Sequence, residues 1–472
     1  MLFAVSLATA PLEAATRHLN LPSLGDTASA EVSIQKEQEL KQIWLMNFRA
    51  KAPLIDDPVT TEYLEQLLTK LAAYSKQPYD QLNLFVVNNK QMNAFAVPGG
   101  VIGVHNGLFR YAKTEDQLAS ILSHELAHLS QRHYARSLAQ QRSNRIPTMA
   151  GMLAGILLVA AGSADVGIAA VQATQAASLQ NSLRYSRLHE LEADRIGLQT
   201  LADAGMNPYA ASEMFEQMLA ASRLYTTKPP EFLLTHPLTE RRVSEAASEA
   251  ERFDRTKARD TLEFDLVQVR AQVQLHNNAA ESRMIYQEKH EEGELAASYG
   301  YALALRGLGL QKTSLEIVEK LSNQYPRQIS LIVSQIELML DLKDLDAASN
   351  LLNAELKQHP ESYALKRLKA KYFEHVRQFK KADIALTQLA EERPFDADIW
   401  YSLAEIRGLG QNIVGLHRAR AEYFILNGGL QQARKQLHYA LKEKQLDYHT
   451  RLRINQRLIE ISELQHTLEN FN

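Results

Sequence analysis

Hydrophobic positions recur at helical spacing along most of the chain, with one short stretch patterned like strands. Apolar residues three and four positions apart predict amphipathic helices in 31–51 and 59–74. Between 82 and 104 the pattern changes to short runs rich in β-branched residues on both sides of Pro98-Gly99-Gly100, which predicts a small sheet with a tight turn. Thr114 then begins a capping pattern, so a new helix is expected directly after it.

From about residue 261 the pattern is helical throughout and repeats. Pro326, Pro360 and Pro394 are spaced by 34 residues, which is the tetratricopeptide period. Two further columns keep this spacing, one of small residues and one of apolar residues: Ala280, Ser314, Ala348 and Ala382, then Met284, Val318, Leu352 and Leu386. The next clear unit, around Ala421 to Ala440, is displaced by half a period, so a lone helix or an irregular repeat is expected before it. The chain is therefore predicted to be mainly α, with a first domain over 16–256 and an α-solenoid over 257–472.

Composition limits the chemistry that this chain can perform. Its 472 residues are 45% hydrophobic and 23% charged, as in ordinary globular proteins, and are enough for two or more domains. A formal net charge of -3, with no basic run interleaved with aromatics, gives no reason to expect nucleic acid as a partner. The chain has no cysteine, so any metal must be held by histidines and carboxylates.

Two apolar segments bear on targeting and on membranes. Residues 1–15 combine a short apolar core with small residues, which predicts a secretory signal, although no Lys or Arg precedes the core. The alternative is a frayed or buried terminus. Residues 147–177 include an apolar run of 14 residues, 149–162, too short for a span of about 20. We expect a buried hairpin or a flap over a cleft there rather than a transmembrane helix, with peripheral membrane contact as the alternative.

The candidate chemistry centres on His124-Glu125-Leu126-Ala127-His128. On a helix, positions i and i+4 share a face, so the two imidazoles can grip one metal ion while Glu125 points into the same cleft. This H-E-x-x-H arrangement is typical of zinc peptidases. In such enzymes the metal polarises the scissile carbonyl, and the glutamate moves a proton from water to the leaving amine. A helix with two surface histidines is the alternative.

A second predicted helix, 185–204, can complete the site. Catalytic zinc normally has a third protein ligand, and Glu190 can supply it. Asp194 lies four positions on, on the same face, where it can accept the free ring N–H of a ligating histidine. Glu192 points roughly 200° away, so we expect a solvated surface charge. His189 is expected to be a histidine on the helix surface.

His236 lies in a predicted loop just before a charged helix over 239–253. It is expected to be either a fourth, displaceable metal ligand or a donor to the tetrahedral oxyanion. The alternative is a structural histidine at the start of the helix. If His236 binds the metal, the resting enzyme is latent, and the preceding loop, 225–230, is a candidate cover for the site.

Four motifs together resemble the HtpX-like zinc peptidases, and with the predicted signal and repeats they look like the periplasmic members of that family. They are Asn93-Ala94-Phe95-Ala96-Val97-Pro98-Gly99-Gly100, the H-E-x-x-H segment, Glu190-Leu191-Glu192-Ala193-Asp194 and Thr235-His236-Pro237. The resemblance implies a gluzincin-type domain with one Zn²⁺ held by His124, His128 and Glu190. It further implies Glu125 as catalytic acid and base and His236 near the metal. We expect the strand from Asn93 through Ala94, Phe95 and Ala96 to pair with the substrate backbone.

The resemblance also implies a cellular role: a periplasmic zinc-dependent endopeptidase with a chaperone-like role in the assembly and quality control of outer-membrane proteins, which degrades misassembled β-barrel proteins. Its implied partners, contacted through the repeats, are the β-barrel assembly machinery and the lipopolysaccharide transporter. The alternative is a chaperone or assembly scaffold in which the repeat domain does the main work and the metal site is latent.

Overall fold

A computed structural model describes most of the chain, in these ranges: 33–75, 82–140, 187–224, 231–254, 256, 261–276, 278–444 and 446–469. The predicted signal at 1–15, the apolar segment at 147–177 and the loop at 225–230 lie outside these ranges. Within them, no helix is both long enough and apolar enough to cross a membrane.

The predicted small sheet is confirmed, with three strands: β1 (Asn83–Val87), β2 (Ala94–Val97) and β3 (Val101–His105). The strand order is β1-β3-β2, with β1 parallel and β2 antiparallel to β3. The hairpin between β2 and β3 needs left-handed backbone at two positions, and Gly99 and Gly100 supply it with φ of 86° and 89°. Because β3 lies between the other two strands, β2 is an outer strand, and only one side of its backbone is paired within this sheet.

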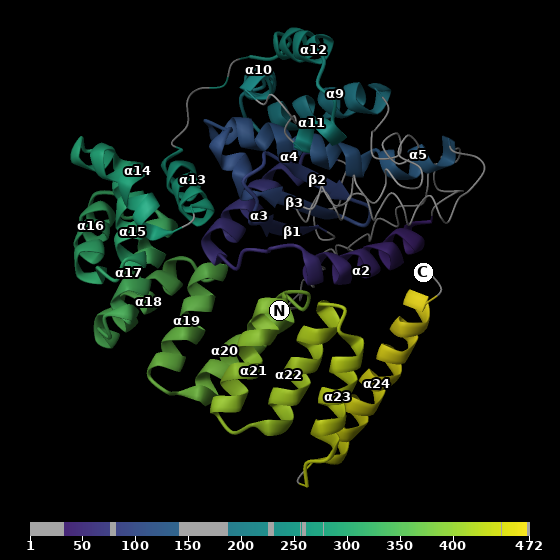
Figure 1. Ribbon diagram of the computed structural model, residues 1–472, viewed down its shortest axis with the longest axis vertical. Coiled ribbons are helices and arrows are strands. Elements are labelled where there is room, and N and C mark those ends of the chain that lie inside the picture. The colour runs from purple at the N-terminus through teal and green to yellow at the C-terminus, as the bar shows by residue number, and fades with distance from the viewer. Residues whose placement is uncertain are drawn as a thin grey trace, which may run out of the picture.

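Helices surround this sheet (Figure 1). In chain order they are α2 (Ile34–Lys51), α3 (Pro58–Ala72), the 3₁₀ helix η2 (Asn106–Arg110), α4 (Glu115–Ser130), α5 (His133–Gln140), α9 (Arg187–Asp203), α10 (Tyr209–Leu224), α11 (Glu231–Thr235) and α12 (Glu240–Ala250). As predicted, α4 begins after Thr114, whose side chain accepts a hydrogen bond from the backbone N–H of Gln117 at 3.3 Å. α9 packs closely on α4 because Gly197 has no side chain: a Cβ there would lie 3.0 Å from the backbone nitrogen of His124.

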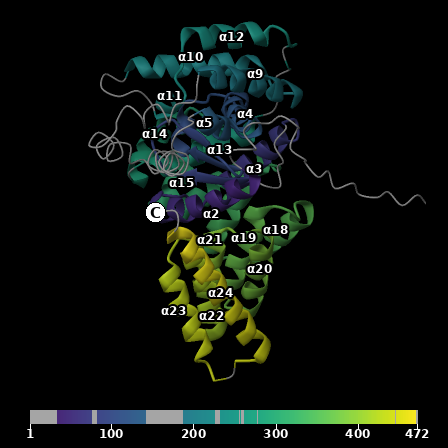
Figure 2. The same cartoon turned by 90° about the vertical axis from the view of Figure 1, so that its right-hand side faces the viewer.

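The predicted solenoid is also confirmed, as a series of antiparallel helices that curves around the sheet-containing part (Figures 1 and 2). Its helices are α13 (Leu262–Leu275), α14 (Ala279–Glu291), α15 (Leu295–Gly307), α16 (Gln311–Gln324), α17 (Ile329–Asp341), α18 (Leu345–Gln358), α19 (Tyr363–His375), α20 (Phe379–Glu392), α21 (Ala397–Leu409), α22 (Ile413–Leu426), α23 (Leu430–Leu441) and α24 (Tyr448–Glu469). Pro326, Pro360 and Pro394 each follow a helix end by two residues, as the 34-residue spacing predicts.

The repeat register is correct in three units and wrong in the first. Small residues at 314, 348 and 382 and apolar residues at 318, 352 and 386 are buried. In α14, however, Ala280 is exposed and the side chain of Met284 is 81% exposed. This helix instead buries Ser282 and Tyr286, two positions later, because the first unit is two residues shorter than the others. The expected lone helix or irregular repeat before Ala421 is not found among the described helices: α21 and α22 begin 34 residues after α19 and α20, and α22 packs against both α21 and α23.

The two parts of the molecule share buried contacts. One hydrophobic cluster joins α3 and α4 to α13, α17 and α19, with Leu64, Leu118 and Phe264 among its members. α2 lies between the sheet and the last repeats in both views (Figures 1 and 2). It packs Phe48 against the sheet side and Met46 against the C-terminal helices. The sheet, the HExxH helix and the repeats are thus one packed assembly.

Candidate metal centre and active site

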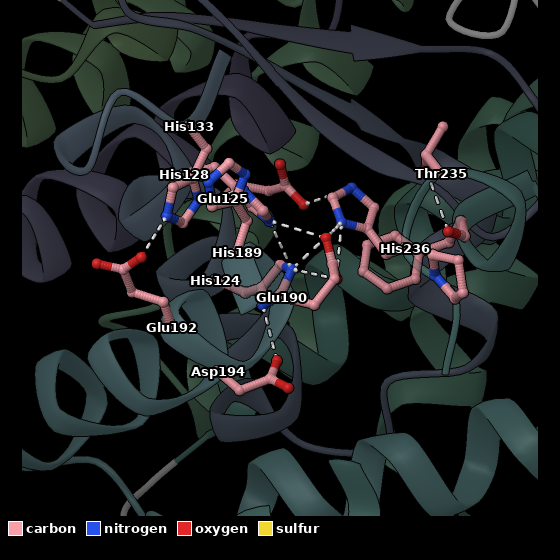
Figure 3. Close-up of polar contacts among 12 residues, drawn as sticks. His124, Glu125, His128, His133, His189, Glu190, Glu192, Asp194, Thr235 and His236 are labelled. Atoms are coloured by element: carbon pink, nitrogen blue, oxygen red, sulfur yellow. Dashed lines mark hydrogen bonds and ion pairs between the residues drawn. The ribbon is translucent and has the colours of Figure 1, made fainter. Parts of the chain in front are cut away.

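Three separate elements bring the predicted ligands together. His124 and His128 lie one turn apart on α4, Glu190 comes from α9, and His236 directly follows α11 (Figure 3). All four side chains are buried. Each offers one ligand atom, and these atoms lie within 4.8 Å of one another; within the described ranges this is the one such group of metal-capable side chains.

The spacing of the donor atoms fits a tetrahedral ion. Nε2 of His124 lies 3.0 Å from Nε2 of His128, 3.3 Å from Nδ1 of His236 and 3.6 Å from Oε2 of Glu190. Oε1 of Glu190 lies 3.5 Å from Nε2 of His128 and 3.1 Å from Nδ1 of His236. A tetrahedron with bonds of about 2.0–2.1 Å has edges of roughly 3.3 Å, so these five separations are close to those of a tetrahedral site.

Nearby histidines keep the Glu190 side chain negatively charged and therefore able to bind a cation. Burial alone would raise the pKa of Glu190, but His236, His124 and His128 hold it well below its ordinary value. Glu190 is therefore ionised in the buried cluster. A carboxylate and three imidazoles without sulfur form the donor set of a nitrogen- and oxygen-liganded metal.

The ring of His124 is held from behind by a carboxylate. Its Nδ1 lies 3.0 Å from Oδ1 of Asp194, the partner predicted for a ligating histidine (Figure 3). Arg242, which the sequence analysis missed, donates two hydrogen bonds of 2.7 Å to Asp194 and places Nη1 2.9 Å from Oε2 of Glu190. Burial would lower the pKa of His124, but Asp194 and Glu190 together raise it to about 9. Asp194 therefore fixes a ring whose other nitrogen faces the cluster.

The ring of His128 is held by a second histidine that the sequence analysis also missed. Nδ1 of His128 lies 2.8 Å from Nδ1 of His133, the first residue of α5. Burial lowers the pKa of His133 to about 4, with nearby His189 adding to the shift. The prediction that His189 lies on the surface is wrong: it is buried and stacks on His133, with ring centroids 4.4 Å apart. The chain reverses after α4, and this brings α5 against α9.

Glu192 was expected to be a solvated charge, and this too needs correction. Its side chain is 26% exposed, and it accepts a hydrogen bond of 2.8 Å from Nη1 of Arg136. It also lies 3.3 Å from Nε2 of His133 (Figure 3). Glu192 does point away from the metal cluster, as helical geometry requires, but it points at the partner of a candidate ligand rather than at solvent.

Glu125 lies beside the cluster against β2. It is fully buried, and one carboxylate oxygen lies 3.6 Å from Nε2 of His236. Burial raises the pKa of Glu125; His236 and His124 oppose this shift, as does the backbone N–H of Ala96. A carboxyl group with a raised pKa suits a residue that must both take up and return a proton near neutral pH.

Comparisons with known proteins identify the family to which the chain belongs. The model of peptidase family M48 matches residues 58–250, and that of ChAPs (Chs5p-Arf1p-binding proteins) matches residues 305–411. A beta-barrel assembly-enhancing protease of Yersinia pestis is 33% identical over 428 residues, which cover 88% of this chain and 85% of the relative. The protein of that name from Escherichia coli (strain K12) is 30% identical over 451 residues, covering 94% of this chain and 92% of the relative.

Identity at this level extends over nearly the whole length of both proteins. This chain belongs to the beta-barrel assembly-enhancing protease family. It is a metallopeptidase with a peptidase M48 part followed by tetratricopeptide-like repeats, as the sequence predicts. Part of the chain is also similar to the mitochondrial metalloendopeptidase OMA1 of Schizosaccharomyces pombe, at 33% identity over 184 residues, 39% of this chain and 51% of the relative.

In this member of the protease family, the expected substrate strand is buried. Asn93, Ala94, Phe95 and Ala96 are all less than 9% exposed. The Phe95 ring turns toward Trp44 and Phe48 and covers Gly103, where a Cβ would lie 2.0 Å from the ring. The side-chain amide of Asn93 has no hydrogen-bond partner among the residues that the structure describes. The strand thus combines an anchored aromatic with an unpaired amide at its start.

Proposed function

We propose that this chain is a zinc endopeptidase of the bacterial periplasm that cleaves misassembled outer-membrane β-barrel proteins. One observation carries the proposal: three imidazoles and a carboxylate place their ligand atoms within 4.8 Å of one another, beside the buried Glu125. Zinc suits this donor set better than magnesium or calcium, which prefer oxygen ligands. The periplasm and the β-barrel substrates are carried over from the name of the relatives and from the resemblance of the motifs.

In this proposal His124, His128 and Glu190 hold the ion. When bound, zinc supplies Lewis acidity that polarises a peptide carbonyl and acidifies water. Glu125 takes a proton onto its carboxylate and returns it to the leaving amine, a role supported by its raised pKa and its position beside the donors. Asp194 orients His124 through the 3.0 Å contact with its Nδ1.

Substrate binding is proposed along β2. An extended peptide adds to the free side of an outer strand by backbone hydrogen bonds, which makes cleavage depend on extended conformation more than on sequence. The outer position of β2 supports this arrangement, because one side of its backbone is not paired within the sheet. Ala96 lies next to Glu125, so a peptide paired here would pass close to the proposed general base.

His236 is proposed to be a displaceable fourth ligand in the resting enzyme. Its Nδ1 lies among the donor atoms, 3.1 Å from Glu190 and 3.3 Å from His124, which favours the ligand role over that of an oxyanion donor. Replacing His236 with Ala should then raise peptidase activity, because a coordination position becomes free. Lost activity with retained zinc would instead assign His236 to the oxyanion.

The repeats are proposed to deliver substrates, with docking to the β-barrel assembly machinery and the lipopolysaccharide transporter as the expectation from resemblance. A scaffold that acts without cleavage is the competing function, and a latent four-donor site is compatible with it. The two can be separated in cells. A Glu125→Gln variant that fully supports barrel assembly would show that the scaffold role stands on its own.

The test of the enzyme proposal uses the same substitution in vitro. Glu125→Gln should keep one zinc per chain, because Glu125 is not a ligand, and should lower cleavage of an unfolded outer-membrane β-barrel protein about 10²–10⁴-fold. Zinc is measured by elemental analysis and cleavage by gel. Unchanged cleavage by this variant would contradict the proposal that the chain is an enzyme.

A further inference from the structure

His133 touches a proposed zinc ligand from the side that faces away from the donor cluster. Its Nδ1 lies 2.8 Å from Nδ1 of His128, and its Nε2 lies 3.3 Å from Oε2 of Glu192 (Figure 3). Glu192 in turn accepts a hydrogen bond of 2.8 Å from Arg136. The contacts form one line from a half-buried ion pair, through a fully buried ring, to the proposed ligand.

The position of His128 decides where the protons lie in this line. Its Nε2 is among the donor atoms, 3.0 Å from Nε2 of His124, so it must present a lone pair to a metal. A neutral imidazole has one N–H, which in His128 is then on Nδ1. This N–H donates to Nδ1 of His133, which must be unprotonated. The single N–H of His133 is therefore on Nε2, where the carboxylate of Glu192 accepts it.

The opposite direction of donation is incompatible with metal binding. If Nδ1 of His133 carried the proton and donated it, Nδ1 of His128 would have to accept. The proton of His128 would then be on Nε2, at the position that the ion needs. Only the direction from His128 through His133 to Glu192 leaves the ligand atom free.

We propose that His133 is a positioning residue that fixes the tautomer and ring orientation of His128 for zinc binding; this rests on the proposed zinc site. Asp194 performs the same task for His124 by direct contact. At His128 an imidazole stands between the ligand and the carboxylate, so the support consists of His133, Glu192 and Arg136 together.

The structure holds the His133 ring firmly enough for this role. Arg132 adopts a left-handed backbone with φ of 49°, which turns the chain directly after α4, and its side chain donates to Glu37 of α2 at 2.8 and 3.1 Å. The ring of His189 lies parallel to that of His133, with an interplanar angle of 9°. His189 immediately precedes Glu190, so the element that carries a ligand also packs the supporting ring.

Two substitutions of similar size separate hydrogen bonding from packing. Asn at position 133 can place Oδ1 where Nδ1 of the imidazole lies and accept the N–H of His128, whereas Leu cannot. His133→Leu should weaken zinc binding about 10–100-fold, the usual effect of losing such a partner, and His133→Asn should stay close to wild type. Affinity is measured by competition with a chelator of known zinc affinity. His375→Leu, on the exposed surface of α19, is the control and should change nothing.

Two affinity results would overturn the inference. In one, His133→Leu binds zinc as tightly as wild type; in the other, His133→Asn loses as much zinc affinity as His133→Leu. The proposed function is judged separately on the wild-type protein, by its zinc content and its cleavage of substrate. If wild type binds one zinc and cleaves while His133→Leu keeps its affinity, only the positioning role fails.

A second measurement needs no variant that might fold poorly. Long-range proton–nitrogen spectra of the zinc-loaded wild-type protein distinguish the two neutral tautomers of each ring. We expect His128 with its proton on Nδ1 and His133 with its proton on Nε2. A proton on Nδ1 of His133 in the zinc-loaded protein would contradict the proposal.

Discussion

The molecule contains two buried polar networks that differ in how their charges are balanced. At the junction with the repeats, Arg270 donates to both oxygens of Asp57 at 2.9 Å, and its Nη1 reaches Tyr299 and Ser334 at 3.1 and 3.2 Å. Each of these donors meets an acceptor. At the metal centre, three ring nitrogens and an oxygen of Glu190 lie within 4.8 Å of one another. The charges of the junction network are balanced within the protein, whereas the donor atoms of the centre are proposed to hold a cation.

This difference separates the substitutions that should affect stability from those that should affect metal binding. A substitution at the junction leaves a buried charge without its partner, and this directly lowers the stability of the folded state. Damage at the centre removes a ligand from a site whose outer partners remain in place. The two networks should therefore respond independently, and the following experiments test that separation.

The largest effect on zinc binding is expected from Glu190→Gln. The substitution keeps the shape of the side chain but removes its negative charge from the donor set, so zinc affinity should fall by more than about 100-fold, beyond the effect of losing an outer partner. Chelator competition measures the affinity. Glu216→Gln on the exposed face of α10 is the matched control. Zinc binding that survives Glu190→Gln would remove Glu190 from the ligand set.

Arg270→Met should affect stability and spare the metal. The side chain of Asp57 is only 3% exposed, so its carboxylate would stay buried without its guanidinium, at a cost of about 3–5 kcal/mol in unfolding free energy. Urea denaturation gives this value, and zinc affinity should stay at the wild-type level. Arg241→Met is the control, because Arg241 is 73% exposed and its loss should change stability by less than about 0.5 kcal/mol. A large loss of zinc affinity in Arg270→Met would show that the two networks are coupled and would contradict the prediction.

Gly197→Ala should lower both the stability and the zinc affinity by a moderate amount. The new Cβ would lie 3.0 Å from the backbone nitrogen of His124 and force α9 away from α4. Overpacking of this kind costs about 1–3 kcal/mol in stability, and the shift also moves Glu190 relative to the histidines. Gln199→Ala, on the exposed face of α9, is the control for a substitution on this helix that brings no new atom against α4. Wild-type stability and zinc affinity in Gly197→Ala would show that the helices tolerate a wider spacing.

The smallest effect is a change with pH at the junction. Burial would raise the pKa of Asp57, but Arg270 holds it below the ordinary value of 3.8. The stability that ionised Asp57 contributes is therefore present above about pH 4 and is lost as the pH falls through the lower pKa of the folded state. The gap in unfolding free energy between wild type and Asp57→Asn should narrow in that window. A constant gap down to about pH 2 would contradict the assigned pKa direction.

Local patterns predicted much of this molecule, because helix faces, caps and the 34-residue spacing are properties of neighbouring residues. The sheet, the solenoid and the meeting of Glu190 with the H-E-x-x-H helix were expected on this basis. Arg242 and His133 were missed for a different reason. Arg242 reaches Asp194 from another helix, and His133 returns to His128 only because the chain turns at Arg132. His189 and Glu192 were misjudged because the partner that covers them, α5, is brought there by the same turn.

The first repeat shows the limit of periodicity. Met284 fits the 34-residue column in sequence but is 81% exposed, because a unit shortened by two residues rotates the buried face of α14. Sequence spacing alone could not distinguish the two registers, since both place small and apolar residues at helical intervals. Packing against α13 and α15 selects the one with Ser282 and Tyr286 inside.

His124, His128, His236 and Glu190 are proposed to hold zinc together in the resting protein. X-ray absorption spectroscopy at the zinc edge of the purified protein tests it most directly. The account predicts four nitrogen or oxygen ligands at about 2.0–2.1 Å with imidazole scattering from three rings, falling to two rings in His236→Ala. A six-coordinate, oxygen-rich zinc, or a spectrum unchanged by His236→Ala, would contradict it.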